Sequence, residues 1–200
     1  MKGSWGRRLG IALRARGSRA ARDRRQRGAV LVEATLILPL IALLTFGAME
    51  YGLAFNEQGD LRSAARSGAR AASTQPKAPN ADFEQAAIDA LNGSAGNLPN
   101  ATPTFALVYD AQDGMFEPTS TGECVSDCRI LTWDGDEFVA TGGAGWDPDD
   151  RAACAGNSDR VGVYVEAHHG FFTGLFGSDG LDLNARAVMA LEPFPGDGCG

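Results

Sequence analysis

The sequence predicts an α+β protein. A long N-terminal transmembrane helix continues into a stem, and a small antiparallel sheet with one short helix lies outside the membrane. Three observations predict this arrangement. An uncharged apolar run fills residues 34–49 of the 200-residue chain. A stretch with helical periodicity follows the run, and short segments of alternating polarity occupy the second half.

The apolar run has the length of one membrane-spanning helix. Together with residues 29–32, on the other side of Glu33, it makes about 21 residues, enough to cross a bilayer. The carboxylate of Glu50 closes the outer end of the run. The run is longer than the apolar part of a secretory signal, and no clear A-x-A cleavage site lies directly after it. We therefore expect this helix to stay in the membrane.

Charge is distributed very unevenly along the chain. Residues 1–28 hold ten of the 18 Lys and Arg and one of the 25 Asp and Glu, a net charge of +9. The other 172 residues hold 8 basic and 24 acidic side chains, a net charge of −16. Positive charge before a span favours a cytoplasmic N-terminus, so the second half is expected outside. A basic tail can bind nucleic acid, but the acidic remainder would repel phosphates, so no nucleic-acid partner is expected.

Helical periodicity continues beyond the apolar run. Small and apolar side chains recur at spacings of three, four and seven residues as far as Ala72. Arg62, Arg66 and Arg70 share a second face, either a solvated stripe or a strip that contacts a partner or the acidic domain. A helix over residues 29–72 would be about 65 Å long.

A second, shorter helix is predicted after a Pro-containing linker at residues 73–80. Residues 81–91 place Phe83 and Leu91 on one apolar face. Asn80 or Asp82 is the expected N-cap, and Asn92-Gly93 is expected to end the helix.

Four segments have the composition or the alternation of β-strands. The last two alternate, with Val161, Val163, Val165 and Ala167 sharing one face of the earlier segment. These two are expected to pair as antiparallel neighbours. The predicted strands are residues 104–109, 129–133, 160–168 and 181–191.

The four cysteines all follow the apolar run, at Cys124, Cys128, Cys154 and Cys199. An even number on one side of a membrane predicts two disulfides in an oxidising compartment, with three possible connectivities. Four ordinary thiols or a zinc site are the alternatives, and the spacing fits zinc poorly. Three of them, Cys124, Cys128 and Cys154, lie in an Asp- and Gly-rich insert at about residues 111–158, whose part from Cys124 to Asn157 is expected to be a solvated, disulfide-tied loop. It lacks the calcium-loop pattern, so no metal or other cofactor is predicted.

No catalytic residue is predicted. His168 and His169 are adjacent, so in a strand they point to opposite faces. The sequence also lacks a nucleophile elbow and a phosphate-binding glycine loop. The apolar cluster at residues 171–176 is expected either to tuck into the core, to dip to the membrane surface, or to form a docking patch for a partner.

In the stretch from Gly28 to Ala34, a glycine precedes the apolar helix and Glu33 stands at the fifth residue after it. In these residues the chain resembles type IV pilins and pseudopilins, and more narrowly the TadE-like family of tight-adherence (Flp-type) pilus assembly proteins. Further shared features lie along the helix, while the acidic insert departs from the family pattern. The matching features are Gly28 to Ala34, Pro39, Phe46-Gly47, Glu50-Tyr51-Gly52, residues 64–70, and a C-terminal strand at residues 185–189.

The resemblance implies a structural role in pilus assembly and secretion. A prepilin peptidase would cut between Gly28 and Ala29, and Glu33 would act in assembly by meeting the new amine of a neighbouring subunit. The partners would be the lipid bilayer, the peptidase and other pilus assembly subunits. Two rivals are a membrane-anchored extracytoplasmic binding module unrelated to pili and a membrane-tethered enzyme. The expected parts are a cytoplasmic leader at 1–28, a transmembrane helix at 29–55, a stem at 56–72 and an extracytoplasmic domain at 73–200 of a single-pass cell-membrane protein.

Overall fold

The computed structural model describes residues 10–96, 98–112 and 115–193. By its internal contacts the chain divides into two compact units, Met1–Ala48 and Met49–Gly200. Helix α1, Gly10–Ser73, supplies all the described residues of the first unit and the first segment of the second. The predicted helix over residues 29–72 is confirmed. It begins earlier than residue 29 because residues 11–27 are rich in Ala and Arg, which are strong helix formers.

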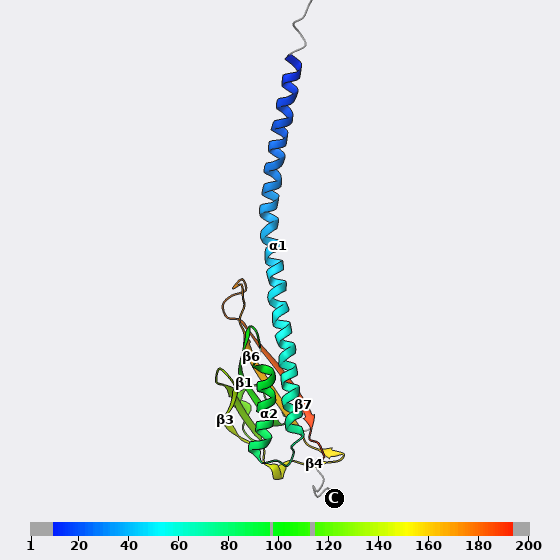
Figure 1. The fold of residues 1–200 in the computed structure, drawn as a ribbon, viewed down its shortest axis with the longest axis vertical. Helices are drawn as coiled ribbons and strands as arrows, with labels where there is room; N and C mark the ends of the chain where they lie inside the picture. Colours follow the sequence, from blue (N-terminus) through cyan, green and yellow to red (C-terminus); the bar gives the residue numbers. More distant parts are fainter. Residues whose placement is uncertain (1–9, 97, 113–114, 194–200) are drawn as a thin grey trace, which may run out of the picture. The chain divides into compact units, whose positions relative to one another are not determined.

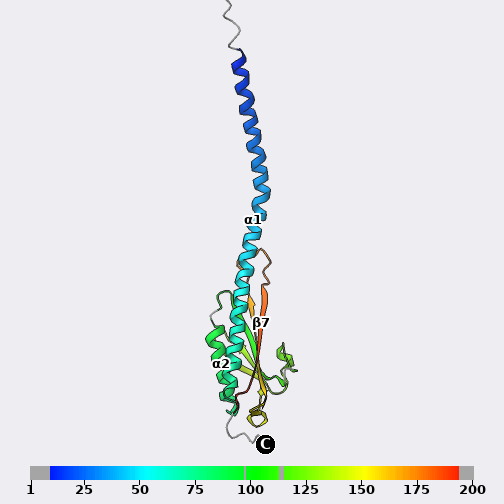
Figure 2. The ribbon, with the colours of Figure 1, turned by 90° about the vertical axis from the view of Figure 1, so that its right-hand side faces the viewer.

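The second unit has two main layers. The C-terminal part of α1 and helix α2, Asn80–Ala95, cover one face of a five-stranded antiparallel sheet (Figures 1 and 2). The strand order is β3-β2-β1-β6-β7. The strands are β1 Ala101–Asp110, β2 Cys128–Trp133, β3 Phe138–Gly145, β6 Arg160–His169 and β7 Leu181–Ala190, with β4 Ala153–Cys154 and β5 Asn157–Ser158 as a separate pair. The predicted α+β class is therefore confirmed.

All four predicted strands are present, and β6 and β7 pair antiparallel as expected, with Val163 opposite Ala187. The odd-numbered positions of β6, Val161 to Ala167, are buried against the helices. Apolar side chains at every second position share one face of a strand, so the face of β6 that packs against the helices was visible in the sequence.

The helix layer lies close to the sheet because α1 presents small residues to it. Ala64, Ala65 and Ala69 are fully buried in the main core. At Gly68 an added Cβ would lie 3.2 Å from the Leu91 side chain of α2 and 3.5 Å from Val163 of β6. A larger residue at this position would push the three elements apart.

A second apolar cluster lies on the other face of the sheet, under the segment between β1 and β2 (Figure 2). Tyr109 of β1 packs edge-on against Phe116 with ring centroids 5.8 Å apart, and burial raises the pKa of Tyr109 to about 12. Gly162 on β6 makes room for this ring, since a Cβ there would lie 2.2 Å from it. Burial therefore extends the pH range over which the phenol stays protonated to well above its ordinary pKa.

The predicted cap of α2 is wrong. Pro79 occupies the N-cap position without a side-chain cap bond, and the helix continues past Asn92-Gly93 to Ala95. The side chain of Asn80 has another partner, because its Oδ1 accepts a hydrogen bond from the Arg151 guanidinium. This partner lies 71 residues further along the chain, so a local pattern could not reveal it.

Arg151 is fully buried where the helices meet the insert. Its guanidinium donates to the carbonyl oxygens of Pro76 at 3.2 Å and Ala78 at 2.9 Å, and to that of Trp146. It also lies 3.9 Å from the centre of the Phe83 ring. Burial lowers the pKa of Arg151, and the carboxylates of Glu84 and Asp147 oppose this shift.

The predicted strand within the acidic insert is present as β2, but the prediction that the segment from Cys124 to Asn157 is a solvated loop is wrong. This segment also contributes β3 to the sheet, and Phe138 and Trp146 lie in the main core. Strand β3 is an edge strand with register shifts opposite Cys128 and Ile130. Gly143 has a φ of +80°, and a Cβ there would lie 2.2 Å from the Cys128 carbonyl oxygen, so only glycine fits this bulge.

One predicted disulfide is confirmed. Cys124 and Cys128 are bonded to each other, with their Cα atoms 5.3 Å apart. Cys154 is also disulfide-bonded. Cys199 lies outside the described residues, so its predicted pairing stays a prediction.

Candidate functional site

The predicted processing residues lie on an open helical surface. Gly28 and Ala29 are exposed, and a Cβ added at Gly28 would meet nothing within 4 Å. Glu33 is exposed as well and lies one helical turn after Ala29, about 6 Å along the axis. Ala29 and Glu33 are four residues apart and therefore share one helix face.

Glu33 stands alone among apolar neighbours. It lines a shallow surface groove on α1 together with Val30, Ala34, Ile37, Leu38 and Ile41. The exposed fractions of Val30 and Leu38 are both 63%. The structure thus places the predicted carboxylate on an unburied apolar helix face.

The apolar part of α1 has the properties of a membrane anchor. The helix from Gly28 to Ser73 contains a stretch long and apolar enough to cross a membrane, and no part of that stretch is buried. The hydroxyls of Thr35 and Thr45 donate to the carbonyl oxygens of Leu31 at 2.7 Å and Ile41 at 2.8 Å. These polar groups are satisfied within the helix, as a lipid environment requires.

Directly after the apolar run, Glu50 binds the connection between β6 and β7. Its side chain is only 1% exposed. Its two carboxylate oxygens accept hydrogen bonds from the backbone N–H of Phe172 at 3.0 Å and of Thr173 at 2.5 Å. The acid predicted to close the apolar run therefore also fixes a loop about 120 residues further along the chain.

Two turns further along α1, Glu57 forms a buried pair with His169. The Oε2 atom of Glu57 lies 2.5 Å from Nδ1 of His169, and both side chains are at most 1% exposed. The other oxygen of Glu57 accepts the backbone N–H of Asn100 at 2.8 Å. One carboxylate thus joins the stem helix to the start of β1 and to the end of β6.

The two histidines point to opposite faces, as predicted. His168 pairs with Asp182 at 2.7 Å on the surface, whereas His169 is in the interior.

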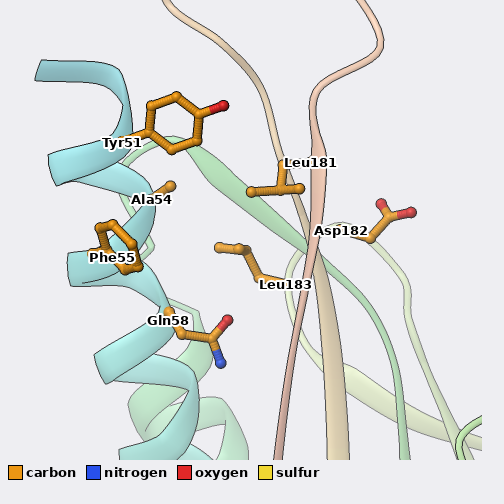
Figure 3. Close-up of a pocket in the computed structure, with 7 residues that line it drawn as sticks. All are labelled: Tyr51, Ala54, Phe55, Gln58, Leu181, Asp182 and Leu183. Atoms are coloured by element: carbon orange, nitrogen blue, oxygen red, sulfur yellow. The ribbon is translucent and has the colours of Figure 1, made fainter. Parts of the chain in front are cut away.

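A groove lies between α1 and β7. It is lined by Tyr51, Ala54, Phe55 and Gln58 of α1 and by Leu181, Asp182 and Leu183 of β7 (Figure 3).

The roles of Glu50 and Glu57 were not predicted from the sequence, although a signal for both was present. They fall at spacings of three and four from Ala54 and Leu61, which are buried, so they lie on the apolar face of the helix. A carboxylate at such a position needs a buried partner. No comparable signal marks Arg151, which follows an acidic run.

One similarity to a known family lies in the N-terminal half of the chain. Residues 28–70 match the family model described as TadE-like protein. Neither the curated proteins nor the solved structures contain a significant match to the chain. The match covers the apolar helix and most of the stem, and it begins at Gly28. Residues 28–70 are therefore similar to the TadE-like family, and this similarity supports a general association of the chain with tight-adherence pili.

Proposed function

We propose that the chain is a pseudopilin-like structural protein of tight-adherence pilus assembly, processed after Gly28 by a prepilin peptidase. The observation that carries this proposal is the family match, which starts at Gly28, the residue before the proposed cut. The exposed position of Gly28 and Ala29 supports access by a peptidase. In this role the chain binds other pilus assembly subunits and carries out no chemistry itself.

We further propose a cytoplasmic leader at residues 1–28 and an extracytoplasmic α+β unit. The net charge of +9 on residues 1–28 supports this orientation, since positively charged flanks stay on the cytoplasmic side. Removal of the leader would leave Ala29 as an amino-terminal cation, one turn from Glu33. A carboxylate in hydrocarbon costs on the order of 3 kcal/mol, and pairing with such a cation on a neighbouring subunit would offset that cost.

Replacing Gly28 with alanine is expected to block processing. In the native host, the wild-type chain should carry Ala29 as its first residue, whereas the Gly28→Ala chain should keep its leader. The substitution meets no steric obstacle on the helix, so it should leave folding and insertion intact. N-terminal sequencing together with the mass of the purified chain measures the outcome.

Gly52→Ala is the matched control, because Gly52 is also an exposed α1 glycine with nothing within 4 Å of an added Cβ. This variant should be processed normally. A wild-type chain that still begins at Met1 in a strain with an active prepilin peptidase would contradict the proposal and favour an anchored binding module.

Replacing Glu33 with alanine is expected to leave insertion and cleavage intact but to impair assembly. Loss of a charge-assisted contact in an apolar environment, worth about 1.5–3 kcal/mol, should reduce assembly by about tenfold or more. Counting surface pili by electron microscopy measures this effect. The control is Thr45→Ala, because Thr45 is also exposed and bonds only within the helix. Normal piliation of the Glu33→Ala strain would remove Glu33 from assembly.

A further inference from the structure

The connection between β6 and β7 carries a cluster of exposed apolar side chains. The exposed fractions are 75% for Phe172, 52% for Leu175 and 39% for Phe176. Tyr51 of α1 is 47% exposed and contacts Phe176 edge-on at 5.7 Å. We call these four residues the aromatic patch. All four belong to the second unit of the chain.

The loop that presents the patch has a defined shape. Glu50 holds the backbone N–H groups of Phe172 and Thr173. Gly174 and Gly177 have φ values of +65° and +103°, which only glycine adopts easily, and they turn the chain on either side of Leu175 and Phe176. The side chains are therefore held outward by a fixed backbone and are not exposed through lack of structure.

The loop that carries the patch is bound to the chain at the outer end of the apolar run. Glu50, which binds the loop, directly follows the uncharged run of residues 34–49. Counted from Ala29, the helix up to Met49 has a length of about 31 Å, close to the thickness of a bilayer's hydrocarbon core. If this helix spans the bilayer, Glu50 lies at the boundary between hydrocarbon and headgroups.

We propose that the aromatic patch inserts into the interfacial region of the membrane leaflet next to the α+β unit, as a second lipid contact beside the helix. Aromatic side chains are enriched at this depth, where their rings contact acyl chains near the headgroups. Residues 170–177 contain no charged side chain that insertion would have to desolvate. The headgroup region still holds water for the remaining backbone groups of the loop, so shallow insertion leaves none of them unpaired.

Lipid fits this patch better than a second copy of the chain does. Four side chains cover far less than the roughly 800 Å² per partner that a stable protein interface buries. The membrane, by contrast, already lies beside Glu50 once the helix spans it. This inference rests on the membrane-spanning helix of the proposed function, but neither on cleavage after Gly28 nor on a role in pili.

Tryptophan depth measurements on the full, unprocessed chain test the proposal. The chain is reconstituted in phosphatidylcholine vesicles, with bromine atoms on the lipid acyl chains as the membrane quencher and acrylamide as the aqueous quencher. Three variants each add one tryptophan: Phe172→Trp in the patch, Leu40→Trp in the apolar run, and Met115→Trp as the control. Met115 is 87% exposed and lies in the segment between β1 and β2. The signal of the unsubstituted chain is subtracted to remove the native tryptophans.

The expected result is that brominated lipid quenches the added fluorescence of Phe172→Trp about threefold more than that of Met115→Trp, as interfacial insertion requires. Leu40→Trp should be quenched by the lipid and protected from acrylamide. Quenching of Phe172→Trp by acrylamide alone would overturn the proposal, since the loop would then be in water. Protection of Phe172→Trp from both quenchers would also overturn it, because a protein partner would then cover the patch.

The Leu40→Trp variant distinguishes the hypothesis of a membrane-spanning helix from the hypothesis that the aromatic patch inserts into the membrane. If Leu40→Trp is quenched by lipid and Phe172→Trp is not, the helix spans the membrane and only the loop proposal fails. If Leu40→Trp is not quenched by lipid, the spanning helix is wrong and the loop proposal fails with it.

Discussion

Replacing Arg151 with methionine is expected to destabilise the α+β unit by about 3–5 kcal/mol, because the guanidinium holds buried acceptors that a thioether leaves unpaired. Those acceptors are the carbonyl oxygens of Pro76, Ala78 and Trp146 and the Oδ1 atom of Asn80. A loss of this size is a large part of the roughly 5–15 kcal/mol that stabilises a typical domain. Urea unfolding of the full chain in detergent, followed by tryptophan fluorescence, measures it.

Lysine at the same position should restore little of the lost stability. It keeps the charge, but a single ammonium group does not reproduce the planar fork that serves several acceptors at once. The control is Arg62→Met on the exposed face of the stem, where a change within about 0.5 kcal/mol is expected. An Arg151→Met chain that unfolds at the wild-type urea concentration would show that the buried guanidinium contributes no net stability.

Removing either partner of the Glu57–His169 pair is the second change with a large expected effect. Glu57→Ala leaves buried His169 and the Asn100 N–H without their acceptor, and His169→Ala leaves a buried carboxylate without its partner. Each variant should lose about 3–5 kcal/mol in the same unfolding measurement. Glu57→Gln keeps an acceptor for Asn100, so its loss should be smaller, about 1–2 kcal/mol.

The double variant measures how much of the stability loss comes from the contact between Glu57 and His169 itself. If the two side chains act together, Glu57→Ala with His169→Ala should cost less than the sum of the single changes, by about 0.5–3 kcal/mol. The neighbouring histidine provides the control. His168→Ala removes an exposed pair with Asp182 and should change stability by at most about 1 kcal/mol. Equal effects of the His168 and His169 substitutions would contradict the importance of the buried pair.

The Glu57 substitutions are also expected to change the dynamics of the loop after β6. Gly170 follows His169 directly and donates its N–H to the carbonyl oxygen of Asn100 at 3.0 Å. Glu57 therefore holds both residues that flank or form this bond: it binds His169, which precedes Gly170, and it accepts the N–H of Asn100. Faster amide exchange in the loop is expected for Glu57→Ala before global unfolding begins.

The parts of the fold that were predictable are those in which one local pattern determines the outcome. Alternation along β6 revealed its buried face, and helical spacing predicted the end of α1 near Ala72. Strand β3 was not predictable, because Gly142, Gly143 and Gly145 interrupt its pattern. Its place in the sheet depends on pairing with β2 through a bulge, which a residue pattern does not encode.

The same distinction holds for the candidate site. The junction of Gly28 and Glu33 is local, so its residues could be named from the sequence. Glu57 was detectable as an acid on an apolar helix face, but its partner lies 112 residues away in the chain. The acceptors of Arg151 are mostly backbone carbonyls, which have no signature in the sequence.

The bulged edge of the sheet has a consequence for how copies of this protein meet at high local concentration. A regular edge strand exposes a row of free N–H and C=O groups on which another sheet can grow, which is a common route to aggregation. In β3 the register shifts opposite Cys128 and Ile130 and the reversed backbone at Gly143 interrupt that row. Copies that gather at high density are thereby kept from joining sheet to sheet along β3, which leaves β7 as the other edge of the sheet at which strands could pair.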